Sequence, residues 1–193
     1  MNEEKTDEEL IAAFKGGEPE ALGLLMERHK AAVYGYLLRL TGRREAAEDI
    51  FQEVFLKLVR SPGVYGERQK FRAWLFTVAR NAAMDFFRRE SSRGEVPLEG
   101  ENGRPGPGDR AVSPEPGPEQ AALDKASGEQ IAAALARLSP DQREVFYLRH
   151  YSELSFKEIA ELLALPIGTV LARMSRAAAL LRKELGKDPG TTQ

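Results

Sequence analysis

The sequence contains no cysteine among its 193 residues. This absence excludes disulfides, thiolate catalysis and cysteine-based zinc sites. The only two histidines, His29 and His150, are far apart, and we predict that each is a surface or helix-end residue rather than a ligand or a base. A glycine-rich phosphate-binding loop is also absent. The sequence therefore predicts no catalytic residues, no metal site and no cofactor, and it favours a protein that is not an enzyme.

An excess of positive charge and long hydrophobic runs are missing as well. The chain has 28 basic and 30 acidic residues, giving a net charge of −2. Any nucleic-acid contact must therefore come from local patches. No run approaches the roughly 18 apolar residues of a membrane span. The acidic start MNEEKTDEEL is unlike a signal peptide, so we expect a cytoplasmic protein without membrane insertion.

One segment stands apart by its composition. Residues 91–120 contain six of the 11 prolines and six of the 17 glycines, with three arginines against six acids. Such a segment buries too little apolar surface to offset its ordering entropy. We predict a flexible linker over residues 91–118, joining an N-terminal domain, 1–90, to a C-terminal domain, 119–187.

Both flanking regions show helical periodicity and no convincing strand alternation, which predicts an all-α fold. Thr6 and Glu9 have the spacing of a capping box, and Ser139 and Ser155 begin further cap signatures. The helices that we expect run from Thr6 to about Gly16, from Pro19 to Leu40, from Arg44 to Arg60, from Arg68 to Arg89, and over 119–137, 140–150, 155–163 and 166–185.

Residues 154–185 read LSFKEIAELLALPIGTVLARMSRAAALLRKEL, a short helix, a tight turn at Pro166 and a longer helix. This is the helix-turn-helix layout. Residues 168–187 have a net charge of +4. We expect a buried stripe of Ile167, Val170, Leu171, Met174, Ala178 and Leu181. The residues that we expect to face DNA are Thr169, Ala172, Arg173 and Arg176. An ordinary helical hairpin with a solvated basic face is the alternative.

The segment AAEDIFQEVFLKLV, residues 46–59, gathers polar residues on one helix face. Asp49, Gln52 and Glu53 have i, i+3 and i+4 spacing, and Phe51 and Phe55 lie alongside. Carboxylates beside exposed aromatic rings would suit a protein-docking surface. The alternative is a solvated acidic face near a helix start, which the helix dipole also favours.

Basic and aromatic residues are interleaved between Tyr65 and Arg89. Residues 68–89 hold six basic residues and one acid. Cations with aromatic platforms suit single-stranded nucleic acid. The candidate residues are Tyr65, Arg68, Lys70, Arg72, Trp74, Asn81, Arg88 and Arg89. Phe76 and Phe87 are more simply explained as core, whereas Tyr65 lies in a glycine-bearing loop and is expected to be exposed.

Three motifs together resemble the small RNA polymerase sigma factors of the extracytoplasmic-function (ECF) type, in the sigma-70 family. They are AEDIFQEVFLKL, FRAWLFTVARNAAMDFFRR and LSPDQREVFYLRHYSELSFKEIAELLALPIGTVLARMSRA. Their order and the linker between the second and third are the specific features. The resemblance covers nearly the whole chain outside the linker, and it implies promoter-specific transcription initiation.

The resemblance also implies roles for individual residues. The face with Asp49, Gln52, Glu53 and Phe55 would bind the RNA polymerase core enzyme. Tyr65, Asn81 and the nearby basic residues would hold the melted non-template strand of promoter DNA, with Asn81 reading a flipped base and Trp74 walling the junction. The C-terminal helix would read the upstream element in the major groove. An inhibitory anti-sigma factor, common in the family, is expected to clamp both domains.

Several positions depart from the family pattern. Leu171 stands where a basic residue is usual, Ala172 where a polar one is usual, Ser175 where an aromatic residue or histidine is frequent, and Thr77 where arginine is frequent. Fewer phosphate contacts lower DNA affinity and flatten its salt dependence. We therefore expect the upstream element to be read less by direct hydrogen bonds and more by groove shape.

The linker length bears on how the chain meets DNA. The two promoter elements are about 70 Å apart, or two helical turns. A coil of about 30 residues spans on the order of 30 Å. We therefore predict that the free protein binds promoter DNA poorly and that polymerase supplies the spacing. The rival interpretations are a helix-turn-helix repressor or activator that acts without polymerase, and a protein-binding helical adaptor.

Overall fold

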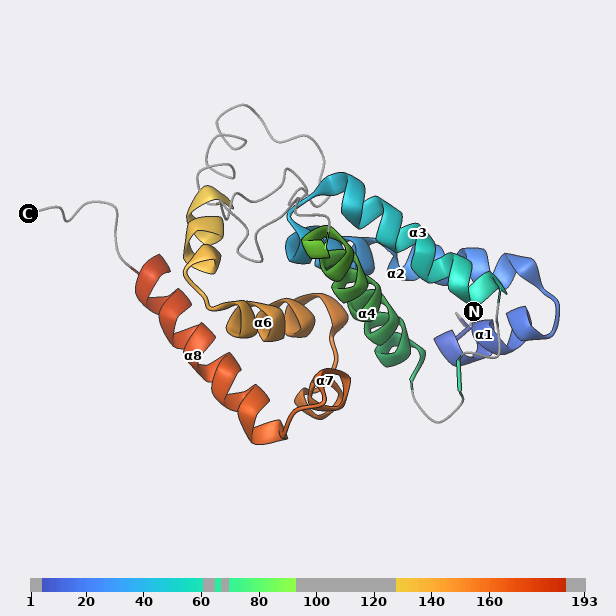
Figure 1. The fold of residues 1–193 in the computed structure, drawn as a ribbon. Coiled ribbons are helices and arrows are strands. Elements are labelled where there is room, and N and C mark those ends of the chain that lie inside the picture. Colours follow the sequence, from blue (N-terminus) through green and yellow to red (C-terminus); the bar gives the residue numbers. More distant parts are fainter. Residues whose placement is uncertain (1–4, 61–64, 67–69, 93–127, 187–193) are drawn as a thin grey trace, which may run out of the picture.

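The computed structural model describes residues 5–60, 65–66, 70–92 and 128–186, and every regular element among them is a helix (Figure 1). The all-α prediction is confirmed. The predicted linker lies outside the described residues, except for Ser91 and Ser92, which end the fourth helix. The elements are α1 (Asp7–Lys15), α2 (Pro19–Thr41), α3 (Arg44–Arg60), α4 (Phe71–Ser92), a helical segment over 128–136, α6 (Pro140–Ser152), α7 (Phe156–Leu163) and α8 (Ile167–Leu185).

Local sequence signals set most of these boundaries. The side chains of Thr6, Ser139 and Ser155 each accept a hydrogen bond from the backbone N–H three residues later, and the side chain at that later position bonds back, so α1, α6 and α7 all begin with a capping box. Gly42 ends α2 in the left-handed conformation, with φ of 66°, which costs glycine little.

The N-terminal half, α1 to α4, is built around α2, which packs against the three other helices. Its buried stripe comprises Leu22, Leu25, His29, Val33 and Tyr36. The prediction of a surface or helix-end His29 is wrong: the ring is fully buried, and its Nε2 lies 2.7 Å from Oδ2 of Asp7 in α1. This contact satisfies one polar atom of the buried imidazole and fastens α1 to α2.

The C-terminal half comprises the 128–136 segment and α6 to α8. The axes of α7 and α8 are bent by 110° about the turn before Pro166, which is the geometry of a helix-turn-helix. Among the described residues no single helix is long and apolar enough to cross a membrane. Helix α8 packs against α6 and α7 and lies at the outer edge of the molecule (Figure 1).

The expected buried stripe of α8 is partly wrong. The buried residues are Val170, Ala177 and Leu181, whereas Ile167 and Leu171 are 48% and 45% exposed. Helices α6 and α7 bury only the strip that carries Val170, Ala177 and Leu181, so Ile167 and Leu171 beside this strip face solvent.

The two halves pack against each other: α6 lies on α2, and α7 lies on α4. Their buried residues form one continuous apolar core. The approach is close at Gly35, where an added Cβ would lie 2.8 Å from Cε1 of Tyr151. In this arrangement the C-terminal half rests on the helices that carry the predicted nucleic-acid contacts.

Candidate protein and nucleic-acid interfaces

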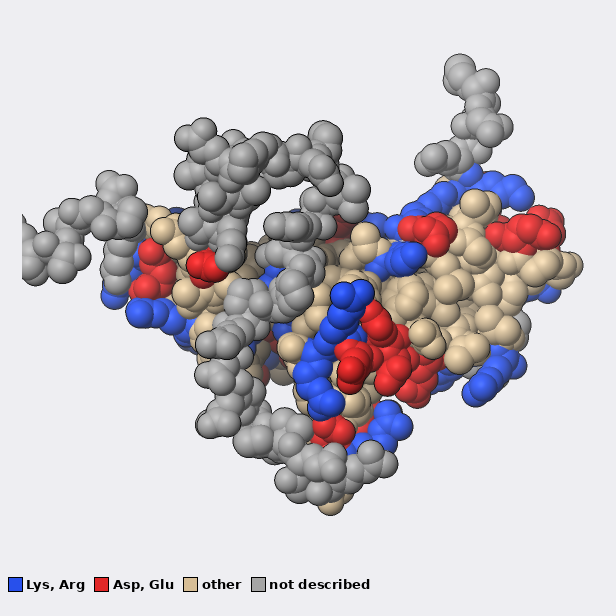
Figure 2. All heavy atoms as spheres, turned by 90° about the horizontal axis from the view of Figure 1, so that it is seen from above, with Lys and Arg blue, Asp and Glu red and all other residues tan. Residues whose placement is uncertain are grey.

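Charge on the surface is local rather than uniform. In the face shown in Figure 2, lysine and arginine side chains lie beside aspartate and glutamate side chains, with uncharged surface between the groups. This distribution agrees with a net charge of −2. Contacts to other macromolecules therefore depend on particular groups of residues.

One face of α3 is exposed and carries both polar and apolar side chains. Asp49, Gln52 and Glu53 all lie on this face, as the sequence predicts. Leu56 and Val59 lie on it too, with 46% and 48% of their surfaces exposed. Neighbouring apolar side chains left in solvent are typical of protein contact sites. They were not predicted as part of this face, although their spacing of i+4 and i+7 from Gln52 places them on it.

Phe55 does not belong to this exposed face. Its ring is buried in the core of the N-terminal half and lies 5.0 Å from the ring of Phe51, centroid to centroid. The expectation of an exposed aromatic contact at Phe55 is therefore wrong. Because it packs beneath the helix, Phe55 supports the exposed face rather than forming it.

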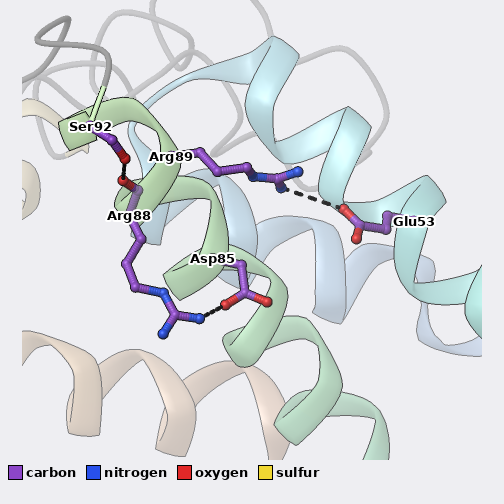
Figure 3. Close-up of a pocket in the computed structure, with 5 residues that line it drawn as sticks. All are labelled: Glu53, Asp85, Arg88, Arg89 and Ser92. Carbon is purple, nitrogen blue, oxygen red and sulfur yellow. Dashed lines mark hydrogen bonds and ion pairs between the residues drawn. The ribbon is translucent and has the colours of Figure 1, made fainter.

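The end of α4 carries a surface groove next to α3 (Figure 3), lined by Glu53, Asp85, Arg88, Arg89 and Ser92. The Arg89 guanidinium lies 3.9 Å from the Glu53 carboxylate, and Arg88 pairs with Asp85 one turn earlier. Ion pairs that are this exposed stabilise a fold by about 1 kcal/mol at most. A phosphate can therefore replace either carboxylate at little cost.

The aromatic residues before α4 form a packed cluster. Tyr65, Phe71 and Trp74 have ring centroids 5.6 to 5.8 Å apart, and all three are buried. The prediction of an exposed Tyr65 is wrong. The Lys15 ammonium donates a hydrogen bond to the Tyr65 carbonyl oxygen at 3.0 Å, which fixes the loop against α1. Of the predicted core residues, Phe76 is buried and Phe87 half-buried.

Among the remaining predicted single-strand contacts, Asn81 is exposed on α4, and Arg68 lies outside the described residues. Three predicted or neighbouring cations pair instead with acids of the C-terminal half. These ion pairs are Lys70 with Glu158 at 3.2 Å, Arg72 with Glu153, and Arg80 with Glu144 at 2.7 Å. The carboxylates occupy the positions that phosphates would take on a cationic surface.

The ion pairs between the halves alter the protonation of their members. Burial favours neutral Glu158, but hydrogen bonds from Ser155 and the Lys70 ammonium lower its pKa below the ordinary value. Burial opposes the charge on Arg80 as well, yet the hydrogen bond and charge of Glu144 raise its pKa. Burial also raises the pKa of the nearby Tyr36 hydroxyl, and the Glu144 carboxylate adds to this rise.

The predicted base-contacting residues of α8 do not all face the same way. Arg176 is exposed, and Thr169 and Ala172 are half-exposed. The Arg173 guanidinium folds back and pairs with the Asp141 carboxylate of α6. Exposed Gly168, Leu171 and Ser175 complete the outward face.

Comparison with known proteins agrees with this architecture. The family model described as Sigma-70 region 2 matches residues 25–93, and the one described as Sigma-70, region 4 matches residues 128–181. The chain belongs to the sigma-70 family, and the ECF sigma factor SigL, which is 36% identical over 91% of this chain, shows that it is an ECF sigma factor. It therefore acts as an alternative sigma factor in transcription initiation, and a repressor that works apart from polymerase is not favoured.

Individual relatives extend along most of the chain. The ECF RNA polymerase sigma factor SigL of Mycobacterium tuberculosis is 36% identical over 183 residues, covering 91% of this chain and 97% of its own. The ECF sigma factor BldN of Streptomyces coelicolor is 32% identical and covers 93% of this sigma factor, which spans 66% of BldN.

Solved structures show the same fold. The sigma factor RpoE, in complex with the anti-sigma factor NepR from Bartonella quintana, has a TM-score of 0.64 at 25% identity and covers 86% of this sigma factor and 97% of its own chain. CnrH, in complex with the cytosolic domain of CnrY, has a TM-score of 0.63 at 25% identity and covers 93% and 96%.

Proposed function

We propose that this sigma factor uses three separate surfaces during initiation. The exposed face of α3 binds the RNA polymerase core, the exposed side of α4 holds the melted non-template strand, and α8 enters the major groove of the upstream element. The main support for this proposal is that one chain of this family carries two features. One is a helix-turn-helix with an angle of 110° between its helices, and the other is a cationic helix.

The polymerase contact rests on the composition of the α3 face. Leu56 and Val59 supply apolar area, and Asp49, Gln52 and Glu53 supply polar groups beside it. Protein interfaces usually combine apolar area with neighbouring polar groups. Because Phe55 packs beneath α3, the face is held rigid before it docks.

The single-strand contact rests on α4 and the loop before it. Asn81, Arg88 and Arg89 are exposed and can reach a base edge and phosphates. The buried rings of Tyr65 and Trp74 fix the start of the helix from which these side chains project. In this proposal the two rings support the strand-binding surface from beneath.

The packing of the two halves suggests how the free protein differs from the polymerase-bound one. Three cations next to the proposed single-strand surface are already paired with carboxylates of the C-terminal half; they are Lys70, Arg72 and Arg80. Promoter binding requires the halves to separate and span both elements. We infer that the free protein remains closed and binds promoter DNA poorly, and that the core enzyme favours the open form.

An anti-sigma factor is the second partner that we propose. Both structural relatives described above were solved in complex with such a partner or with its cytosolic domain. A protein that binds only the closed arrangement would stabilise it by mass action and compete with polymerase. Restoration of transcription by excess core enzyme would support this competition.

A reconstituted system tests the whole proposal. Purified core polymerase is mixed with the sigma factor, and run-off transcription is measured on genomic fragments. Promoter-dependent transcripts that require the sigma factor are expected. Failure to bind the core enzyme, or binding without initiation, would refute the assignment of these surfaces.

A further inference from the structure

The outward face of α8 has an unusual composition for a helix that enters a DNA groove. Between Ile167 and Ser175, the exposed positions of α8 are small or apolar. They are Ile167, Gly168, Leu171 and Ser175. Among these exposed positions only Ser175 has a side-chain hydrogen-bonding group, and the half-exposed Thr169 supplies the other hydroxyl of this part of the helix.

Ile167 and Leu171 form an exposed apolar pair one helix turn apart. Nearly half of each side chain faces solvent even though the two halves of the protein are packed together. The pair is therefore available for contact with another molecule. One turn advances about 5.4 Å, which is between one and two base steps of about 3.4 Å, so the pair can meet neighbouring base pairs.

Charge elsewhere on the exposed surface of α8 indicates the kind of partner. Arg182, eleven residues after Leu171, projects from the same side of the helix, and exposed Arg176 and Lys183 lie further round it. Cationic side chains on the same helix as an exposed apolar pair suit a partner that carries both negative charge and apolar groups. The major groove offers both, because phosphates line its edges and the C5-methyl of thymine is the apolar group on its floor.

We propose that Leu171, flanked by Ile167, determines upstream-element specificity by contacting thymine methyl groups. This inference rests on the proposed upstream contact of α8. A leucine cannot satisfy the polar major-groove edge of guanine, cytosine or adenine, and it would remove water from that edge without replacing its hydrogen bonds. The exposed Leu171 thus adds a direct apolar contact to an element that the sequence predicts is read less by hydrogen bonds and more by groove shape.

Deoxyuridine provides a direct test, because it keeps every hydrogen-bonding group of thymidine and lacks only the methyl. Holoenzyme is assembled from core polymerase and the full chain. Thymines of the upstream element are then replaced one at a time, and promoter affinity is measured. Loss of one methyl contact should weaken binding by about fourfold at one or two neighbouring positions. With Leu171→Ala holoenzyme the same replacement should have little effect.

A matched control separates this role from a general effect of truncating a leucine. Leu185 lies at the other end of α8 and is 47% exposed, almost the same as Leu171. Leu185→Ala should retain the full penalty for deoxyuridine. Leu171→Arg provides a second variant: a guanidinium at this place should shift the preferred base from thymine to guanine.

The possible outcomes are distinct. If the holoenzyme initiates normally but deoxyuridine changes nothing, or if the penalty is the same for Leu171→Ala, methyl reading is overturned while the proposed function stands. If the sigma factor does not support promoter-dependent initiation on unmodified DNA, the proposed function fails and the inference fails with it.

Discussion

Arg80 of α4 and Glu144 of α6 form a partly buried ion pair, with 2.7 Å between Nε and Oε1, across the boundary between the two halves of the chain. Their residue numbers differ by 64, and the predicted linker lies between them. The pair therefore reports on the closed arrangement of the whole molecule rather than on the stability of either half.

Reversing one charge of this pair should open the protein. In Glu144→Lys, two cations would face each other at a site with limited access to water, which costs several times more than losing an exposed ion pair. We expect a larger radius of gyration in small-angle X-ray scattering and tighter binding of a single-stranded oligonucleotide. The free wild-type protein should bind the same oligonucleotide weakly.

The control must add the same charge elsewhere. Glu20→Lys changes net charge by the same amount and lies in the exposed first turn of α2, fifteen residues before Gly35, where α2 meets Tyr151 of α6. It should leave the radius unchanged. The double exchange Arg80→Glu with Glu144→Arg should close the molecule again; an open double variant would show that the pair does not hold the halves together.

Truncation at the centre of the α3 face should weaken polymerase binding without unfolding the protein. Leu56 is exposed, so Leu56→Ala removes little buried area and keeps a strong helix former. We expect core affinity to fall by about tenfold, as for a central interface residue. Leu24→Ala, at an exposed leucine of α2, should leave affinity unchanged. Equal affinities for both variants would exclude this face as the docking site.

The Asp7 carboxylate should make the attachment of α1 pH-dependent. Burial favours its neutral form, but hydrogen bonds from His29 and Arg28 lower its pKa below 3.8. Because the pKa is lower in the folded state, the ionised carboxylate stabilises the fold at pH values above its ordinary pKa. This contribution is lost as pH falls through the folded-state pKa. Asp7→Asn should therefore cost about 1–3 kcal/mol at pH 7.

The difference in unfolding free energy between wild type and Asp7→Asn should shrink as pH falls below about 4, because the wild-type carboxyl becomes neutral too. Chemical denaturation at several pH values measures it. Asp49→Asn, at an exposed acid, should show almost no difference at any pH. A constant penalty for Asp7→Asn would mean that shape rather than charge matters there.

Features encoded by neighbouring residues could be predicted from the sequence. Three capping boxes, the left-handed Gly42 and the turn before Pro166 all depend on contacts within a few residues. The burial of His29 was also within reach, since it continues the spacing of Leu22, Leu25 and Val33. A surface position was predicted because the side chain is polar. The residue that pairs with it, Asp7, is 22 residues away, so the local sequence did not reveal how a buried imidazole would be satisfied.

Features set by distant partners could not be predicted. Tyr65 looks like a loop residue until α1 and the start of α4 enclose it. Leu171 fits a helical stripe, but the width of the surface that covers α8 decides which apolar residues are buried. The pairing of Lys70 and Arg72 with acids beyond the linker has no local signature at all.

Gly168 offers the cleanest separation of folding from DNA recognition. A Cβ at this position meets no protein atom within 4 Å, and alanine favours the helix, so Gly168→Ala should raise stability by up to about 1 kcal/mol. If the first turn of α8 approaches base edges, the added methyl should still weaken upstream-element binding by about tenfold, as loss of one base contact does. A Cβ added at Gly23 in α2 also meets nothing within 4 Å, so Gly23→Ala should stabilise the protein and leave promoter affinity unchanged. Thermal unfolding and holoenzyme binding of both variants measure the two effects, and unchanged promoter affinity in Gly168→Ala would place the first turn of α8 away from the DNA.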